Sequence, residues 1–137
     1  MKTSRIRIKT KGNTDVINIT PRIEEIVKNE AVKDGILFLQ VIGSTAAITT
    51  MEYEPGQKKD LKALLEELIP YRSDWAHNFT WGDDNGHSHL RSSFLKTNYF
   101  IPVTGAKLDL GTWQQVVLID FDTRAREREI VVKIIAE

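Results

Sequence analysis

Residues 36–42, with the sequence Ile-Leu-Phe-Leu-Gln-Val-Ile, are apolar at nearly every position, and this run constrains the fold more than any other segment. A strand with one wet face alternates apolar and polar residues, whereas a strand covered on both faces reads as a continuous apolar run. We therefore predict a central strand of a sheet at 36–42.

Further strands are predicted on both sides of this central strand. At the start of the chain, Ile6 and Ile8 alternate with Arg5 and Arg7, as in a half-buried strand. A turn at residues 11–13 leads to a returning strand at 16–19. The other predicted strands lie at 46–51, 99–103 and 108–110, and a closing hairpin joins 116–121 to 130–135 with residues 122–125 at its tip.

Two amphipathic segments predict helices. The first begins at Thr20 as its cap, has Pro21 at its first position, and ends at the Asp34-Gly35 step. The second repeats leucine at helical spacing over 60–68 and is stopped by Pro70. The chain has no linker, repeat or low-complexity tract. We therefore predict one α+β domain over residues 1–137, rich in strand, with two main helices.

Composition excludes several classes of function. The 137 residues contain no cysteine, so the chain has no thiolate nucleophile, zinc finger or iron–sulfur cluster. Its 19 basic and 19 acidic residues cancel, which argues against broad capture of nucleic acid or an acidic membrane. No apolar run approaches the roughly 20 residues of a spanning helix. The start alternates instead of forming a signal-peptide core, so we expect a cytoplasmic protein.

The segment 71–91 shows neither helical nor strand periodicity, and it contains all three histidines. A long irregular stretch in a compact domain is usually functional. If His87 and His89 lie on a strand, both imidazoles share a face and can act as metal ligands with His77, while Asp84 completes or orients the set. A histidine general base beside a carboxylate needs the same residues. Surface histidines in a polar loop are the alternative.

Other segments offer anion-binding groups. The Gly43-Ser44-Thr45 corner can present N–H groups and hydroxyls to a phosphate, although the sequence alone favours a simple tight turn. Arg124, Arg126 and Arg128 share a face if extended, as an anion clamp or as a solvated charge ladder beside Glu127 and Glu129. Glu52 is either functional or a solvated edge carboxylate, and Trp113 is a candidate core residue.

Taken in order, four segments resemble the YjbQ-like family, whose members are often labelled secondary thiamine-phosphate synthases. The segments are Ile48-Thr49-Thr50-Met51-Glu52-Tyr53-Glu54-Pro55-Gly56, His77-Asn78, Trp81-Gly82-Asp83-Asp84-Asn85-Gly86-His87-Ser88-His89 and Gly111-Thr112-Trp113-Gln114-Gln115. The resemblance implies an α+β fold with a β-sandwich, a homotrimer, and a polar pocket near a subunit boundary.

In the family, residues that match His77, Asp84, His89 and Glu52 line this pocket. The resemblance ranks His87 below His89, because His87 is similar to a feature of one branch of the family. Two positions depart from the pattern: Gly43 stands where many members have histidine, and Lys96 stands where many have glycine.

The resemblance also implies weak thiamine-phosphate formation, in which a pyrimidine pyrophosphate joins a thiazole phosphate and releases pyrophosphate. We therefore expect an enzyme that acts on a small phosphorylated metabolite, with Mg²⁺ or Zn²⁺ as a candidate cofactor. The candidate substrate-binding residues are Ser44, Thr45, Arg91, Thr112, Trp113 and Arg124. The alternatives are a non-catalytic trimer that binds a metabolite or metal, and a structural role for the loop at a subunit interface.

Overall fold

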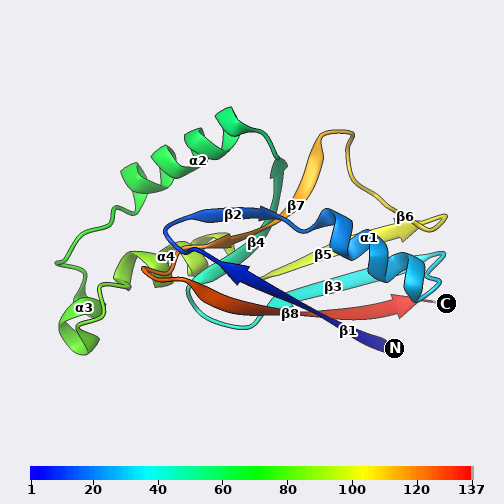
Figure 1. Ribbon diagram of the computed structural model, residues 1–137, viewed down its shortest axis with the longest axis horizontal. Coiled ribbons are helices and arrows are strands. Elements are labelled where there is room, and N and C mark those ends of the chain that lie inside the picture. The colour runs from blue at the N-terminus through cyan, green and yellow to red at the C-terminus, as the bar shows by residue number, and fades with distance from the viewer. Residues whose placement is uncertain (137) are drawn as a thin grey trace.

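The computed structural model describes residues 1–136, which form two antiparallel sheets and four helices (Figure 1). The strands are β1 (Lys2–Thr10), β2 (Asp15–Asn18), β3 (Gly35–Val41), β4 (Ala46–Glu52), β5 (Asn98–Thr104), β6 (Lys107–Leu108), β7 (Gln114–Asp120) and β8 (Arg126–Ala136). The helices are α1 (Thr20–Asn29), α2 (Pro55–Leu68), α3 (Ala76–Trp81) and α4 (Gly86–Leu95).

The larger sheet has the strand order β1-β8-β3-β5-β6, and the smaller sheet has the order β2-β7-β4. The predicted central strand is confirmed: β3 pairs with β8 on one side and β5 on the other. Its inward side chains Leu37, Leu39 and Val41 are fully buried. The main core combines residues of both sheets with Ile23 and Val27 of α1. The expected strand-rich α+β architecture is therefore present, with a core between two sheets.

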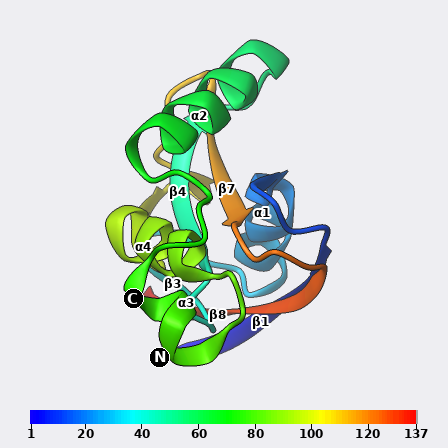
Figure 2. The ribbon, with the colours of Figure 1, turned by 90° about the vertical axis from the view of Figure 1, so that its left-hand side faces the viewer.

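The small sheet is covered on both faces. Val116 and Leu118 of β7 point into the main core, whereas Val117 and Ile119 point to a second core that includes Leu65 of α2. Because side chains alternate along a strand, one face of β7 packs against the larger sheet and the opposite face packs against α2. Figure 2 shows α2 lying along this outer side of β4 and β7.

Two strand pairings were predicted wrongly. The segments 116–121 and 130–135 are not a hairpin, because β7 belongs to the small sheet and β8 to the large one. Similarly, β2 does not return along β1: β2 pairs with β7, and β1 pairs with β8. Short connections suggested local hairpins, but each connection carries the chain from one sheet to the other.

Element boundaries also differ from the prediction. Helix α1 ends at Asn29 rather than near Asp34, because Ala31 adopts a left-handed conformation with φ 53°. Thr20 does not cap this helix through its side chain; its hydroxyl accepts a hydrogen bond from the N–H of Val116 instead. Helix α2 begins earlier than predicted, at Pro55, with the Glu54 carboxylate accepting hydrogen bonds from the N–H groups of the first turn.

The segment 71–91 contains the whole of α3 and the N-terminal part of α4. The prediction that this segment is an irregular loop was therefore wrong. The buried residues of α4 are largely polar: Gly86, His87, Ser88, Arg91 and Ser92. An apolar stripe is the usual sequence signal of a packed helix, and this helix lacks one. The described residues therefore form four helices rather than the two main helices that were predicted. Within the described residues, no helix is long and apolar enough to cross a membrane.

Candidate functional site

Two histidines and an aspartate meet at the end of the molecule that carries α3, opposite the two chain termini (Figure 1). His77 belongs to α3, Asp83 to the turn after it, and His89 to α4. The ring centroids of His77 and His89 are 4.4 Å apart, and Nε2 of His77 lies 3.0 Å from Oδ1 of Asp83. One ligand atom from each residue lies within 4.8 Å of the others. We call these three residues the histidine cluster.

Local structure holds α3 and α4 in this arrangement. Helix α3 ends at Gly82, which has φ 65°. The Asn78 side chain then joins the two helices: its Oδ1 accepts from the N–H of Gly86 at 2.9 Å, and its Nδ2 donates to the carbonyl of Arg72 at 3.1 Å. A Cβ at Gly86 would lie 2.6 Å from Cβ of Trp75, so only glycine permits this close approach. His77 and His89 are therefore positioned by the backbone of two short helices.

The backbone around His89 fixes which ring nitrogen is available. Nδ1 of His89 lies 3.0 Å from the carbonyl oxygen of Ser44, which can only accept a hydrogen bond. Nδ1 therefore carries the proton, and Nε2 presents a lone pair when the ring is neutral. This arrangement, with one ring nitrogen donating to a backbone carbonyl, is usual for a histidine that binds a metal through the other nitrogen.

Asp83 is held in its ionised form. Burial alone would raise its pKa, but hydrogen bonds from the N–H of Asn85 and from His77, together with the charges of His77 and His89, lower the pKa below its ordinary value. The Asn85 N–H lies 3.1 Å from Oδ1 of Asp83, the geometry of an Asx-turn. The cluster therefore presents an ionised carboxylate at neutral pH.

This donor set suits some metals better than others. Two imidazole nitrogens and one carboxylate oxygen match Zn²⁺ and similar transition-metal ions, which accept nitrogen and oxygen ligands. Mg²⁺ strongly prefers oxygen ligands and water. Of the two cofactors considered from the sequence, the residues present therefore fit Zn²⁺ better than Mg²⁺.

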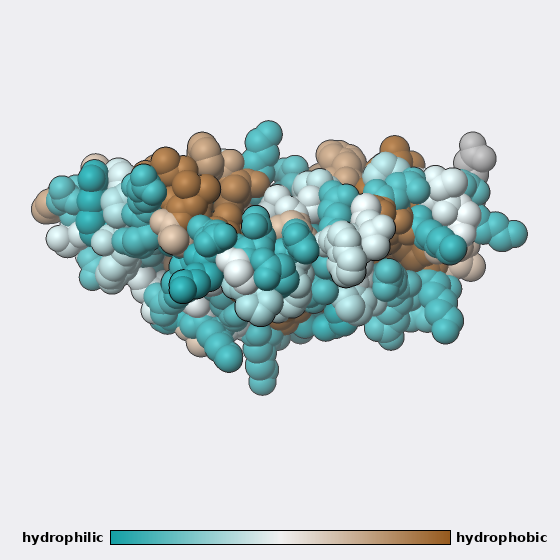
Figure 3. Space-filling model, turned by 90° about the horizontal axis from the view of Figure 1, so that it is seen from above, coloured by the Kyte–Doolittle hydropathy of each residue, from teal (hydrophilic) through white to brown (hydrophobic). Residues whose placement is uncertain are grey.

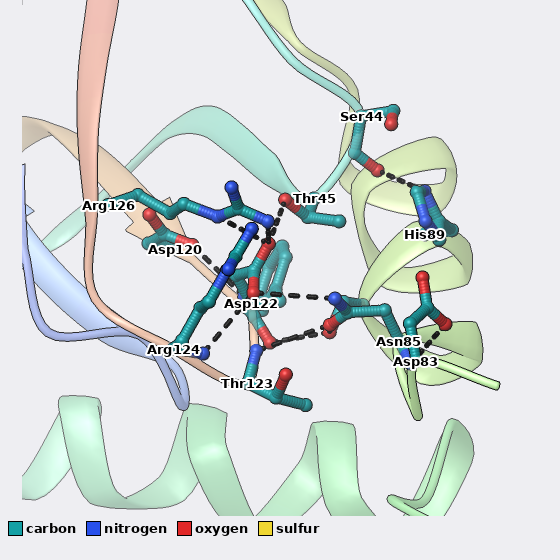
Figure 4. A network of polar contacts seen from close by, with 12 residues as sticks. Ser44, Thr45, Asp83, Asn85, His89, Asp120, Asp122, Thr123, Arg124 and Arg126 are labelled. Atoms are coloured by element: carbon teal, nitrogen blue, oxygen red, sulfur yellow. Dashed lines mark hydrogen bonds and ion pairs between the residues drawn. The ribbon is translucent and has the colours of Figure 1, made fainter. Parts of the chain in front are cut away.

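A hollow of about 330 Å³ adjoins the cluster at His89. Its lining is polar and has one histidine and one lysine; the residues are Gly43, Ser44, His89, Ser92, Ser93, Lys96, Thr97 and Asn98. Ser44 lies beside His89, and the chain then turns inward at Thr45 (Figure 4). The hollow therefore joins the Gly43–Thr45 corner to the outer face of α4.

On the inner side of the same corner lies a second group of charges, which we call the buried ion-pair cluster: Asp120, Asp122, Arg126 and Arg128. Arg128 donates from Nε and Nη2 to the two carboxylate oxygens of Asp120, at 2.7 and 2.8 Å. Arg126 pairs with Asp122 at 3.0 Å, and the Thr45 hydroxyl donates to Asp122 at 3.0 Å. This cluster ties the corner to β7 and β8.

Asp122 also holds the start of α4. Its Oδ1 accepts from Nδ2 of Asn85 at 3.3 Å (Figure 4). Burial alone would raise its pKa, but hydrogen bonds from Thr45, Asn85 and the N–H of Arg124, and the charge of Arg126, lower the pKa below its ordinary value. Asp122 is therefore ionised at neutral pH, and Arg126 compensates its charge.

His87 does not join the histidine cluster, because residues two apart on a helix point to different sides. The prediction that His87 and His89 share the face of a strand was wrong. His87 is only 3% exposed and packs edge-on against Tyr71, with ring centroids 4.4 Å apart. Burial, followed by the charge of Arg91, lowers its pKa to about 4. Its Nδ1 is buried without a hydrogen-bond partner among the described residues.

The carboxylate of the cluster comes from Asp83 rather than from Asp84. Asp84 adopts a left-handed conformation, with φ 54°, and its side chain is exposed. The signal that was overlooked is the Asp83-Asp84-Asn85 sequence itself. In an Asx-turn the first residue bonds to the N–H two positions later, so its side chain is the oriented one.

Several predicted substrate-binding residues lie elsewhere. Arg91 is buried and donates to Glu66, Thr14 and the carbonyl of Ile69. Arg124 is exposed, just before β8. Arg126 and Arg128 form neither an anion clamp together nor a solvated ladder, because both pair with buried aspartates.

Glu52, Thr112 and Trp113 form a separate group at the far end of β4. Glu52 is opposite Gln114 in the β4–β7 pairing, whereas Ala46, which follows the Gly43–Thr45 corner, is opposite Asp120. Six residue steps along a strand separate these ends by about 20 Å. Trp113 is 73% exposed, so its assignment to the core was wrong. Within one chain, Glu52 is therefore remote from the histidine cluster.

The chain was compared with known proteins. The family model for the UPF0047 protein YjbQ-like family matches residues 4–137. A UPF0047 protein from Methanocaldococcus jannaschii is 37% identical, with 97% of this chain and 94% of the relative covered. A UPF0047 protein from Archaeoglobus fulgidus is 31% identical, with 93% and 97% covered.

Solved structures agree in fold over the whole chain. A YbjQ-like protein of unknown function from Sulfolobus solfataricus P2 has a TM-score of 0.90 and 35% identity, with 99% of both chains covered. A hypothetical protein from Aeropyrum pernix K1 has a TM-score of 0.93 and 31% identity, with 100% of both chains covered. Sequence and fold together show that this chain belongs to the UPF0047, or YjbQ-like, protein family.

Proposed function

We propose that this protein is a metal-dependent enzyme acting on a small phosphorylated metabolite, with the histidine cluster as its reactive centre. The observation that carries the proposal is the convergence of His77, Asp83 and His89, with Nδ1 of His89 tied to the carbonyl of Ser44. Nitrogen lone pairs and an ionised carboxylate aimed at one point are typical of a metal or acid–base site.

Each residue has a distinct role in this proposal. Nε2 of His89 and the Asp83 carboxylate hold the ion, and His77 either adds a third ligand or carries a proton between Asp83 and the substrate. A bound divalent ion supplies positive charge that stabilises a departing phosphate or pyrophosphate. The polar hollow beside His89 holds the rest of the substrate.

The finer activity that we propose follows the resemblance: a weak condensation of a pyrimidine pyrophosphate with a thiazole phosphate. The thiazole nitrogen forms the new carbon–nitrogen bond, the carbon–oxygen bond to pyrophosphate breaks, and pyrophosphate leaves with the electron pair. No proton transfer is needed for this displacement, so charge stabilisation at the leaving group is the main demand on the site.

The deciding experiment combines elemental analysis with turnover. Protein stripped with chelator and reloaded with Zn²⁺ or Mg²⁺ is offered a panel of phosphate and pyrophosphate esters, and released phosphate or pyrophosphate is measured. We expect turnover with Zn²⁺ and its loss in His89→Ala, with His87→Gln as the matched control outside the cluster. Equal turnover in wild type and His89→Ala, or a wild type that binds no metal, would refute the proposal.

A homotrimer is part of the same proposal. Helix α3 exposes Phe79 and Trp81 at 79% and 74%, and α4 exposes Phe94. Viewed from above, the largely hydrophilic surface is interrupted by apolar patches (Figure 3). Monomers seldom expose such patches without a use for them. A trimer that covers these side chains can also place Glu52 of one subunit near the histidine cluster of another, since the two are remote within one chain.

Sedimentation equilibrium tests this assembly. We expect a mass three times the 15.6 kDa of one chain at micromolar concentration. Replacing Phe79 and Trp81 together by serine should shift the equilibrium towards the monomer. A monomeric wild type at that concentration would contradict the proposal.

One observation favours a second function, that of a non-catalytic binding protein. Beyond His89, the hollow is lined by glycine, serine, threonine, asparagine and lysine, which bind oxygen-rich ligands but do not form an acid–base pair. In that case metal and metabolite should raise the melting temperature while no substrate of the panel turns over.

A further inference from the structure

The corner at Gly43 leaves room for a buried arginine to approach it. Gly43 has φ +137°, a conformation that other residues rarely adopt. A Cβ built at Gly43 would lie only 2.7 Å from Nη1 of Arg128. The guanidinium of Arg128 therefore fills the space that any other side chain at this position would need.

One end of this guanidinium has no hydrogen-bond partner among the described residues. Nε and Nη2 of Arg128 donate to Asp120, and Nη2 also donates to Thr45. Among residues 1–136, no acceptor is bonded to Nη1. Arg128 as a whole is only 7% exposed. Nη1 is not among the buried atoms that lack a partner, so it reaches solvent beside Gly43 and can donate to a ligand bound there.

The backbone of the corner adds further donors. The N–H groups of Gly43 and Ser44 are bonded to no acceptor within the described part of the chain, whereas the neighbouring N–H of Ile42 donates to Glu129. Both residues are exposed. Successive free N–H groups at a turn form a concave site for anions, which an arginine strengthens with charge-assisted hydrogen bonds.

The charges around the corner also favour an anion. Asp120 and Asp122 are matched by Arg128 and Arg126, so the buried ion-pair cluster has no uncompensated carboxylate. Lys96 lines the same hollow as Gly43 and Ser44, and no carboxylate lines it among the described residues. The side chains of Glu127 and Glu129 flank Arg128 in sequence but point to the other face of β8.

We propose that the Gly43–Ser44 corner, together with Nη1 of Arg128 and the ammonium group of Lys96, is a binding site for a tetrahedral oxyanion, the phosphate group of the substrate. The inference deepens the proposed function, on which it rests for the reaction served. Because Ser44 also accepts the Nδ1–H of His89, a phosphate held at this corner lies directly beside the histidine cluster. The Gly43–Thr45 corner and Arg128, which the sequence suggested separately as anion-binding groups, thus lie next to each other.

The test uses metal-free protein and inorganic phosphate as the probe. In a titration followed by ¹⁵N–¹H correlation spectra, we expect the amide signals of Gly43 and Ser44 to shift with phosphate and far less with chloride at equal ionic strength. Shifts confined to other residues, or no saturable shift, would overturn the proposal. This readout needs no variant and does not depend on metal.

Two variants sharpen the test, each with a matched control. Gly43→Ala should weaken phosphate binding at least about tenfold, because the new Cβ displaces Nη1 of Arg128. Gly105→Ala is its control: Gly105 also has a positive φ, of 56°, but nothing lies within 4 Å of the added Cβ. Lys96→Gln should weaken binding about threefold, with Lys107→Gln as control. Equal affinities in Gly43→Ala and Gly105→Ala would refute the assignment.

A crossed measurement separates this inference from the proposed function. His89→Ala should lose Zn²⁺ and keep phosphate binding in metal-free protein, whereas Gly43→Ala should keep Zn²⁺ and lose phosphate. If wild type binds phosphate at the corner but no metal, the proposed enzyme fails and the anion site stands. If it binds metal but no phosphate, the anion site fails and the metal site stands.

Discussion

Two groups of charged side chains lie on opposite sides of the Gly43–Thr45 corner, and they differ in burial. The buried ion-pair cluster has its aspartates 0% exposed, and its four charges compensate one another. The histidine cluster is partly open, with the His77 and Asp83 side chains 30% and 40% exposed. The two sets therefore differ in accessibility: the aspartates of the first are closed off within the protein, whereas the second can be reached from solvent.

The largest expected effect is on stability, in the buried ion-pair cluster. Arg128→Ala leaves Asp120 buried without its partner, and such changes lower the free energy of unfolding by about 3–5 kcal/mol. Urea denaturation measures the loss. Arg7→Ala is the control, because Arg7 on the paired strand β1 forms an exposed ion pair with Glu129. This substitution should lower the free energy of unfolding by less than about 1 kcal/mol. Equal losses would show that burial gives the Arg128–Asp120 pair no more weight than an exposed ion pair.

The next effect concerns metal affinity in the histidine cluster. His89→Ala removes a nitrogen ligand and should weaken Zn²⁺ binding about 100-fold, while the melting temperature moves by only a few degrees. Isothermal titration calorimetry and thermal denaturation of the same samples give both quantities. A large loss of stability with unchanged affinity would make His89 a structural residue like those of the buried ion-pair cluster.

A smaller effect distinguishes two neighbouring carboxylates. Asp83→Asn replaces a charged ligand by a neutral amide and should weaken Zn²⁺ binding about tenfold. Asp84→Asn should leave affinity unchanged, because the Asp84 side chain lies outside the cluster and asparagine tolerates the left-handed conformation. Competition with a chromogenic chelator measures both variants. The reverse order of effects would restore the original prediction of Asp84 as the ligand.

The smallest effect is a dependence of stability on pH. The pKa of Asp122 is lower in the folded protein than its ordinary value of 3.8, which applies to the unfolded chain. As the pH falls, the Asp122 carboxylate therefore takes up a proton in the unfolded chain before it does so in the folded protein. The stability that Asp122 contributes above the unfolded pKa is lost as the pH falls through the folded pKa. Below about pH 4, wild type should lose stability more steeply with falling pH than Asp122→Asn, as measured by urea denaturation. If the free energy of unfolding falls equally with pH in both proteins, Asp122 does not contribute to the pH dependence of stability.

The sequence predicted those parts of the fold in which burial is apolar. The central strand β3 and the alternation in β1 follow from aliphatic periodicity, and both are present. Helices α3 and α4 were missed because their buried faces are made of serine, histidine, arginine and asparagine. Ser88 and Ser92 each donate to a backbone carbonyl across the interface, to Phe121 and Ala46, at 2.6 Å. Packing through hydroxyl groups leaves no signature in hydropathy.

The candidate site was predicted only in part. His77 and His89 were identified by their concentration in one segment, and the structure brings them together. Asp83 was missed in favour of Asp84, because the orientation of a turn side chain depends on backbone geometry that residue type alone does not give. Lys96 likewise adopts a positive φ, of 72°, a conformation that favours glycine and that its residue type does not reveal.

The pairing of β1 with β8 joins the first strand of the chain to the last. Lys2 lies opposite Ile134, and Thr10 lies opposite Arg126. During synthesis, β1 has no partner until β8 has been made, and β3 likewise waits for β8 on one side. The large sheet therefore closes only after residues 126–136 have been made, through contacts between segments far apart in sequence. Such a topology makes folding slow and leaves the nascent N-terminal strand as an unpaired edge on which a chaperone, or another nascent copy, can act first.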